Sequence, residues 1–267
     1  MPFIKLENFS GIVPRLGVSQ LPTNAAQIAR NVKLQSGELR PWRRRSFEYE
    51  LTEPDVQTIY KLYNNASGDF RWLEFTDDVN IVKSPIADDT DYRVYYTDSD
   101  GPKKTNWDLA TDGGTGDGPY PIDYLNLGVP APTAAPTLSA SGGSGSLETR
   151  AYVYTNVSTF GSVTEESAPS AAATVDCYEV GATVTINGFS AAPTTGYNIT
   201  HRRIYRTVVG ATTVSYQLVA EILVSATSFD DDLAVADLGI LLATNSWNEP
   251  PSDLQGLVTM PNGMLAG

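Results

Sequence analysis

Four short runs of β-type sequence, closely spaced between residues 58 and 96, decide the predicted fold. They are Thr58-Ile59-Tyr60-Lys61-Leu62-Tyr63, Phe70-Arg71-Trp72-Leu73-Glu74-Phe75, Val79-Asn80-Ile81-Val82 and Tyr92-Arg93-Val94-Tyr95-Tyr96. Each run is rich in β-branched or aromatic residues, and Asn, Asp, Ser, Gly and Pro separate it from the next. Antiparallel neighbours need such turns, so we expect one four-stranded sheet of about the size of a β-propeller blade.

A second series of short strands follows in residues 137–245, with no helical pattern between them. The predicted strands are 137–139, 150–155, 182–186, 203–206, 217–222 and one near Ser228-Phe229. Strands at this spacing over roughly 110 residues are typical of an immunoglobulin-like or fibronectin type III-like β-sandwich. We therefore expect an all-β protein with propeller-like segments and a sandwich.

The N-terminal region is predicted to hold one short helix and one hairpin. The helix begins near Leu21-Pro22, with Thr23 or Asn24 as its cap and Gln27 reaching back. The hairpin pairs residues 31–34 with 38–42, across a turn at Gln35-Ser36-Gly37.

Composition also marks the boundaries between domains. Residues 130–136, with three prolines, are typical of a linker, and the Gly-rich residues 101–128 and 142–145 predict a long loop and a flexible connection. Residues 257–266 look like a hairpin that resumes the first sheet and is cut short. The predicted domains are a docking segment at 1–56, a propeller-like blade with its loop at 57–127, the sandwich at 128–248 and the resumed sheet at 249–267.

The charge is strongly acidic overall but basic at the N-terminus. The net charge is -13, with a pI near 4.4, which argues against a general basic surface that wraps nucleic acid. Residues 1–50 carry +4, so the remainder carries -17 by difference. The N-terminal segment is therefore expected to have different neighbours from the rest of the chain.

Few residues are suited to chemistry. One cysteine, Cys177, and one histidine, His201, allow neither an intrachain disulfide nor a multi-histidine metal site. Asp230-Asp231-Asp232 and Asp98-Ser99-Asp100-Gly101 have oxygens that calcium could use, but solvated turns favour the same residues. We expect no catalytic residue, cofactor or metal, and no enzyme.

The start of the chain lacks the apolar core of a signal peptide, and no apolar run of about 18 residues occurs. Neither membrane insertion nor Sec export is expected. The sharpest charge feature is Arg43-Arg44-Arg45, which predicts either docking to an acidic partner or phosphate, or a solvated β edge that its charge protects from pairing.

Several stretches resemble bacteriophage tail nozzle or tail-hub proteins of the phage stabilisation-like kind. They are residues 11–15, 21–32, 37–42, 93–97, 101–105 and 257–267. The resemblance touches both ends of the chain and leaves the predicted sandwich as an insertion between propeller pieces.

This resemblance implies a ring subunit, usually hexameric, that forms part of the DNA ejection conduit of a phage tail. It implies contacts with adaptor or portal-side proteins and fibre proteins, transient passage of DNA, and a place in the virion after synthesis in the host cytoplasm. The residues expected at a partner interface are Arg15, Arg30, Arg40, Arg43, Arg44 and Arg45. The acids expected to face the lumen are Asp88, Asp89, Asp91, Asp98 and Asp100.

Two other functions stay open. The first is an exported carbohydrate-binding or adhesion module, for which a fibronectin-like domain is common. The second is a polysaccharide-degrading enzyme of a phage tail, which requires a carboxylate pair in a groove lined by aromatics such as Trp72 and Trp107.

Overall fold

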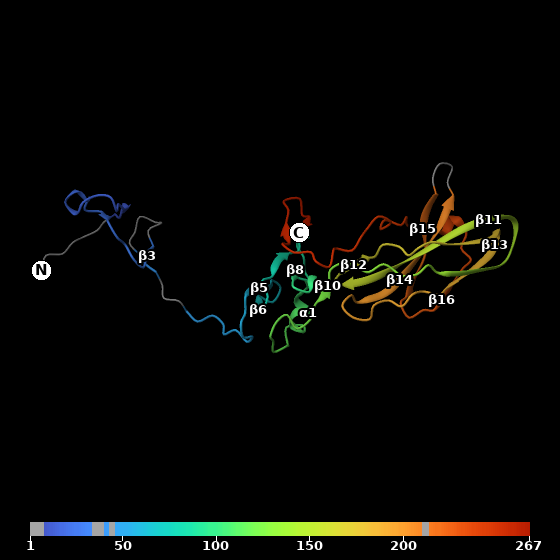
Figure 1. The fold of residues 1–267 in the computed structure, drawn as a ribbon, viewed down its shortest axis with the longest axis horizontal. Helices are drawn as coiled ribbons and strands as arrows, with labels where there is room; N and C mark the ends of the chain where they lie inside the picture. The colour runs from blue at the N-terminus through green and yellow to red at the C-terminus, as the bar shows by residue number, and fades with distance from the viewer. Residues whose placement is uncertain (1–7, 34–39, 43–45, 210–213) are drawn as a thin grey trace. The chain divides into compact units, whose positions relative to one another are not determined.

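The computed structural model describes residues 8–33, 40–42, 46–209 and 214–267. The chain divides into two compact units, Met1–Glu50 and Leu51–Gly267. The described chain is mostly β, and its longer strands lie in the second unit (Figure 1). In the part of the chain that the structure describes, no helix is long and apolar enough to span a bilayer.

The elements of the first unit that the structure describes are short. They are β1 (Gly11–Ile12), the 3-10 helix η1 (Val18–Gln20), β2 (Ala25–Ala26), β3 (Val32–Lys33) and β4 (Arg40–Pro41). β1 pairs with β2 in parallel and β3 pairs with β4 in antiparallel register. The pairing predicted for 31–34 and 38–42 is thus confirmed by β3 and β4, while its turn lies outside the described residues.

The helix predicted near Thr23 and Asn24 is wrong. Ala25 and Ala26 form β2, and the backbone N–H groups of Ser10 and Val13 donate to the carbonyls of Asn24 and Ala26, each at 2.8 Å. A helix this short makes few internal hydrogen bonds, and these do not offset the conformational entropy lost in forming its first turn. Pairing with β1 satisfies the same backbone groups.

The second unit begins with two small sheets. β5 (Thr58–Asn64) and β6 (Asp69–Phe75) form a hairpin, while β7 (Asn80–Lys83), β8 (Val94–Asp98), β9 (Gly101–Thr105) and β10 (Leu125–Asn126) form an antiparallel meander. The four predicted strands therefore exist, but their predicted union in one sheet is wrong. The third and fourth predicted strands are β7 and β8, which form a sheet with β9 and β10. β9 and β10 lie in the stretch predicted to be a long loop.

Burial explains why β9 was missed from sequence. Its sequence, GPKKT, is polar and contains Gly and Pro, yet all five residues are buried. The ammonium of Lys103 meets Asp98 at 2.7 Å and that of Lys104 meets Glu165. Two paired lysines thus occupy positions where strand patterns call for apolar residues.

The short helix α1 (Trp107–Thr111) follows β9. Asn106 caps it by accepting a hydrogen bond from the Leu109 N–H at 2.9 Å, and it ends at Asp112 in the left-handed conformation (φ 50°). Trp107 and Ala110 join the core of this region, which also contains Leu62, Leu73, Phe75, Val79, Val94, Tyr96 and Tyr120.

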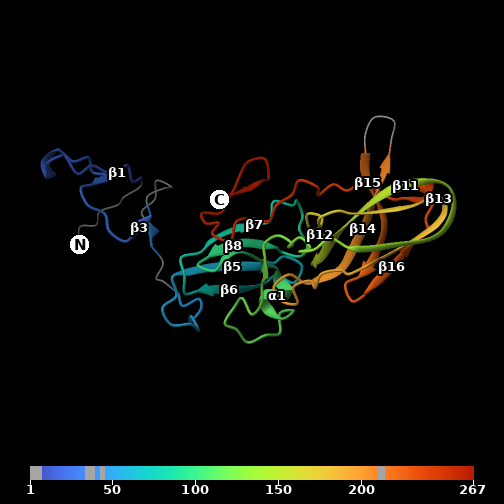
Figure 2. The same ribbon diagram turned by 45° about the vertical axis from the view of Figure 1, so that its right-hand side comes forward.

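The larger sheet has six strands and curls into a half-barrel (Figure 2). Its strands are β11 (Thr137–Phe160), β12 (Val163–Glu166), β13 (Ala173–Asn187), β14 (Ile199–Val209), β15 (Val214–Leu223) and β16 (Ser228–Asp231). The order is β15-β14-β11-β13-β16, with β12 also on β11. We refer to it as the curled sheet.

The long strand β11 holds the curled sheet together. Residues 137–152 pair with β13, and residues 152–158 pair with β14. The predicted strands are confirmed, but hydrogen bonds join them into one sheet rather than the two separate sheets of a sandwich. The flexible connection predicted at 142–145 is also wrong, because these glycines continue β11 beside β13 through a register shift after Ser144.

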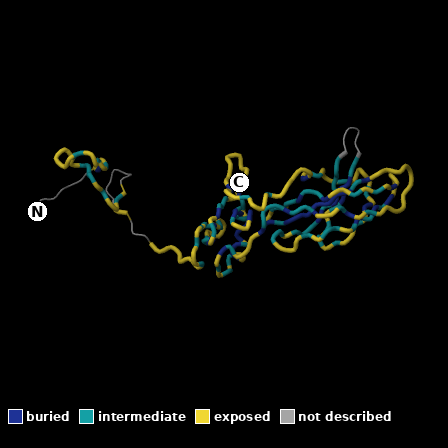
Figure 3. Tube along the Cα trace, in the orientation of Figure 1, coloured by how far each residue is buried: buried dark blue, intermediate teal, exposed yellow. Residues whose placement is uncertain are grey.

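The curled sheet has its own core, formed by Tyr152, Tyr154, Cys177, Ala182, Val184, Ile186, Ile204 and Val219. In Figure 3 the buried residues gather in this sheet and in the region of β5 to β10, so the second unit has two cores. They lie in sequence on either side of the linker at 130–136.

The C-terminal segment returns to the smaller sheets. After the 3-10 helix η2 (Val235–Asp237), strands β17 (Val258–Thr259) and β18 (Leu265–Ala266) form the predicted hairpin. β17 lies beside β7, and Leu257 is buried.

Candidate functional site

One hollow in the region of β5 to β10 is lined by both carboxylates and aromatic rings. It has a volume of about 290 Å³, and its lining includes Glu53, Glu74, Asp77 and Asp98 together with Phe75, Tyr96, Tyr120 and Tyr124. We call it the acidic pocket. It is the candidate functional site, because carboxylates and aromatic faces converge there on one space.

Backbone contacts between distant segments build the acidic pocket. The N–H of Glu74, on β6, donates to the carbonyl of Tyr120 at 2.7 Å, and Leu73 forms a bridge with Tyr120. The hydroxyl of Thr105 donates to the carbonyl of Asp123 at 2.9 Å. These bonds attach residues 119–124 to β6 and β9, so the three tyrosines meet although 28 positions separate the first from the last.

Glu74 is the most unusual residue of the acidic pocket. It is only 6% exposed, and its Oε2 accepts hydrogen bonds from the backbone N–H groups of Thr52 at 2.8 Å and Glu53 at 2.9 Å. Its Oε1 is buried and has no hydrogen-bond partner within the described residues. A buried carboxylate oxygen without a donor is costly, so this atom is a ready acceptor.

The aromatic side of the acidic pocket is packed in fixed geometry. The rings of Phe75 and Tyr96 lie 5.2 Å apart, and those of Tyr96 and Tyr124 meet edge to face at 6.5 Å. Burial, reinforced by the nearby charge of Asp98, raises the pKa of Tyr96 well above its ordinary value. Tyr96 therefore stays neutral and acts as a wall.

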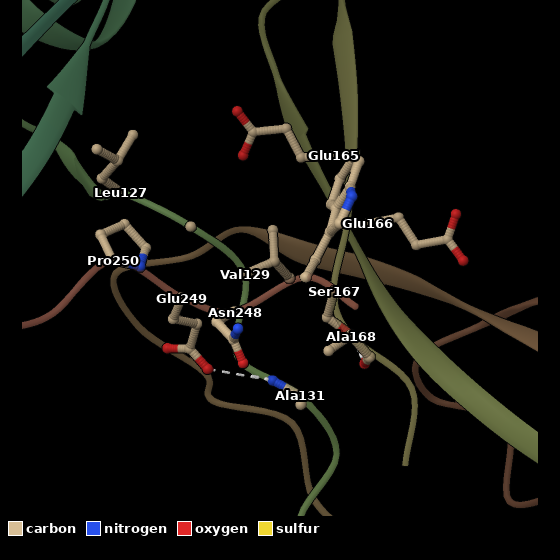
Figure 4. Close-up of a pocket in the computed structure, with 12 residues that line it drawn as sticks. Leu127, Val129, Ala131, Glu165, Glu166, Ser167, Ala168, Asn248, Glu249 and Pro250 are labelled. Atoms are coloured by element: carbon tan, nitrogen blue, oxygen red, sulfur yellow. Dashed lines mark hydrogen bonds between the residues drawn. The ribbon is translucent and has the colours of Figure 1, made fainter. Parts of the chain in front are cut away.

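A second hollow, of about 450 Å³, lies beside the linker (Figure 4). Figure 4 shows Glu165 and Glu166 pointing to opposite sides, as neighbours on a strand do. Glu166 accepts from Thr155 and Tyr205, each at 2.7 Å, and from Arg203 at 2.8 Å. Since the carboxylate of Glu166 is already hydrogen-bonded within the protein, we interpret this hollow as structural and not as a binding site.

The acids predicted to face a lumen have different surroundings. Asp89 and Arg93 form a buried ion pair at 2.7 Å, Asp91 accepts from the backbone and hydroxyl of Ser162 at 2.6 Å, and Lys103 bridges Asp98 and Asp100. Asp88 is exposed and has a positive φ of 52°. Asp98 alone of the five lines the acidic pocket.

The arginines predicted at a partner interface lie in the first unit. Arg15 and Arg30 are exposed, and Arg40 belongs to β4. Arg43, Arg44 and Arg45 lie outside the described residues.

The other residues considered for chemistry have structural surroundings. Asp231 is buried against Arg206 at 2.6 Å and Tyr152 at 2.7 Å. His201 meets the hydroxyl of Thr200 at 2.9 Å, and burial raises the pKa of Cys177. Within the described ranges, no group of three or more His, Cys, Asp or Glu is arranged to hold a metal ion.

Sequence reasoning missed the acidic pocket. Trp72 and Trp107, named as possible aromatics of the alternative saccharide groove, do not line this pocket, and Trp107 is buried in the core. The one available signal is the Pro- and Tyr-rich stretch Pro119-Tyr120-Pro121 followed by Tyr124, which lies in the predicted loop.

The first unit presents a different feature, namely uncovered apolar side chains. Phe47 is 80% exposed, Val18 79% and Ile28 72%, whereas Phe9 is the only buried apolar residue among those described up to Glu50. Apart from Phe9, the described residues of this unit are exposed or intermediate (Figure 3). The described part of the unit therefore lacks a hydrophobic core of its own.

No protein family model matches the chain, and a search of curated proteins finds no match either.

Proposed function

We propose that this chain is a structural subunit of a bacteriophage tail, in a nozzle or hub ring that forms part of the DNA ejection conduit. The ring is a homo-oligomer, a hexamer by the resemblance, that contacts adaptor or portal-side proteins and fibre proteins. It belongs to the virion after synthesis in the host cytoplasm, is not an enzyme and does not insert into membranes.

The observation that carries this proposal is the uncovered apolar surface of the first unit. Large side chains such as Phe47, Val18 and Ile28 are exposed although burial of each is worth roughly 1.5–3 kcal/mol. The described residues of the first unit form two-residue strands, one 3-10 turn and one buried apolar residue, and a segment of this kind gains its stability from a partner. An assembly subunit has that partner in its neighbours.

The charge supports the same proposal. The net charge of -13 leaves the surface outside the basic N-terminal segment strongly acidic. A conduit with an acidic wall repels the phosphates of DNA, so the polyanion passes without adhering.

In this proposal, the smaller sheets are propeller-like segments and the curled sheet is an immunoglobulin-like or fibronectin type III-like domain. The antiparallel meander of β7 to β10 has the four strands of a propeller blade, and the curled sheet has about the length of an immunoglobulin-like or fibronectin type III-like domain. In a ring, blades from neighbouring copies cover the edges that a single chain leaves open.

Negative-stain microscopy of the full chain tests the proposal. We expect closed rings with a central channel, either alone or on addition of other tail proteins. Monomers in both conditions would contradict it.

The acidic pocket favours a second candidate, a carbohydrate-binding module, because saccharide sites also combine carboxylates with aromatic faces. Binding of an oligosaccharide by a chain that remains monomeric distinguishes this function from the first.

A further inference from the structure

We propose that the acidic pocket binds the guanidinium group of an arginine presented by a partner chain, and that the partner is a second copy of this protein. The choice of a second copy rests on the proposed assembly function. The binding of an arginine does not.

The strongest support comes from Glu74. Its Oε2 is held by two backbone donors, while Oε1 is buried without any. The terminal torsion of a glutamate is soft, so a small rotation brings Oε1 toward a donor that enters the pocket. A guanidinium supplies several N–H donors in a planar fork, which matches a carboxylate in shape and charge.

The charge of the pocket favours a cation over a neutral ligand. Among the four carboxylates in its lining, only Asp98 has a described cationic partner, Lys103 at 2.7 Å. For Glu53, Glu74 and Asp77, no Lys or Arg of the described chain lies within ion-pair distance. Three uncompensated carboxylates around one hollow attract a positive group.

The aromatic wall fits the same ligand, and the chain already shows the pattern. The ammonium of Lys103 lies 4.4 Å from the centre of the Tyr124 ring while it pairs with Asp98. Arg71 likewise lies 6.0 Å from the ring of Tyr120. The face of an arginine prefers such rings, and the contact is stronger where water is excluded.

The volume of the pocket and the available arginines of the chain restrict the identity of the ligand further. A volume of about 290 Å³ is at the lower end for ligand pockets, which suits one side chain rather than an extended molecule. The sequence supplies arginines at positions 40 and 43–45 within the basic N-terminal segment. A contact from this segment of one copy to the acidic pocket of the next is heterologous, and heterologous contacts that close generate rings.

Calorimetric titration of the full chain, diluted until it is monomeric so that no neighbouring copy occupies the pocket, with a peptide of residues 38–46 tests the proposal. The control peptide carries citrulline, a neutral isostere, in place of every arginine. We expect the arginine peptide to bind and the citrulline peptide to bind at least about tenfold more weakly, because charge-assisted hydrogen bonds are lost.

Matched variants locate the site. Glu74→Gln keeps the shape and removes the charge, so it is expected to weaken peptide binding by about tenfold or more. Glu179→Gln, which removes an exposed carboxylate of the curled sheet, controls for general electrostatics and should leave binding within about twofold. If Glu74→Gln unfolds, Asp77→Asn serves in its place, since Asp77 also lines the pocket.

Equal binding of both peptides, or equal binding by the Glu74 and Glu179 variants, would overturn the proposal. So would binding of a neutral glucose hexasaccharide that Glu74→Gln abolishes, because the pocket would then be a saccharide site. A chain that forms rings when concentrated but binds no peptide when diluted to the monomer contradicts only this inference. Peptide binding by a chain that never forms rings contradicts the assembly function.

Discussion

At the scale of single residues, the curled sheet is tied together by a buried polar triad. Arg206 and Asp231 are 1% and 0% exposed at their side chains and lie 2.6 Å apart, and the hydroxyl of Tyr152 donates to the same carboxylate at 2.7 Å. Burial, with the adjacent charge of Asp231, raises the pKa of Tyr152 above its ordinary value, so it remains a donor. The triad joins β11, β14 and β16 across the core.

Removing one charge from the triad should be strongly destabilising. Asp231→Asn leaves Arg206 buried without its counter-charge, and we expect the free energy of unfolding in urea to fall by about 3–5 kcal/mol. Asp232→Asn, one residue further and exposed, is the control and should change it by less than about 0.5 kcal/mol. A similar loss in both variants would show that the triad has no special role.

The Asp89–Arg93 pair should make stability depend on pH. Burial alone would raise the pKa of Asp89, but the hydrogen bonds and charge of Arg93 outweigh it and lower the pKa below 3.8. A lowered folded-state pKa stabilises the fold above the unfolded value, and this stability is lost as the pH falls through the folded value.

The test compares the unfolding free energies of the wild type and Asp89→Asn along a pH series. We expect their difference to be constant above the ordinary value of 3.8 and to shrink in more acidic solution. Asp88→Asn is the exposed neighbouring control. A wild-type advantage that persists unchanged in acid would contradict the assignment.

Single-residue roles could be predicted only in part. Of the acids predicted to lie in a solvated turn, Asp100 does, whereas Asp98 ends β8 and pairs with Lys103. The engagement of Asp231 could not be foreseen, because its partners Tyr152 and Arg206 are 79 and 25 positions away. Side chains that meet through tertiary packing leave no local pattern.

At the scale of elements, the glycines of β11 determine how two long strands stay paired. Gly143 has a φ of 88°, and a Cβ there would lie 2.8 Å from the Cβ of Tyr178 and 3.0 Å from Ala182 on β13. Gly181 also has a positive φ, 66°, but a Cβ there meets nothing within 4 Å. Alanine substitutions at these two positions therefore distinguish the cost of backbone strain from the cost of crowding.

Both substitutions to alanine should destabilise the protein, but to different extents. Gly181→Ala is expected to cost about 1–2 kcal/mol from the left-handed backbone alone. Gly143→Ala should cost about 1–3 kcal/mol more, because the strands must move apart. Equal losses of unfolding free energy in denaturant would contradict the close approach of β11 and β13.

Strands were easier to predict than their partners. The runs at 58–63 and 70–75 appear as β5 and β6, because β-branched and aromatic residues are concentrated there. β9 was missed because ion pairs let lysines occupy buried positions, and the helix at residue 24 was wrong because strand pairing satisfied the same backbone groups. Pairing order depends on contacts distant in sequence, which local patterns do not encode.

At the scale of the whole molecule, the uncovered apolar side chains of the first unit are the basis of the assembly proposal. We predict that Val18→Ser, Ile28→Ser and Phe47→Ser combined will prevent self-association, since each side chain otherwise contributes roughly 1.5–3 kcal/mol on burial. The melting temperature of the monomer should change little, because these residues lie outside both cores of the second unit.

The matched control replaces exposed apolar residues of the second unit, Leu223→Ser and Ile240→Ser, at 59% and 64% exposure. Sedimentation velocity should give the wild-type assembly for this control and a monomer for the triple variant. Loss of assembly in both the triple variant and the control would show that assembly depends on general surface hydrophobicity and not on the first unit.

Light scattering over a range of concentrations gives the native mass of the full chain and so tests whether the protein assembles. We expect a discrete multiple of the 28.8 kDa chain mass, which the triple variant reduces to the monomer. A wild-type chain that remains a 28.8 kDa monomer at every concentration, alone and with other tail proteins, would contradict it.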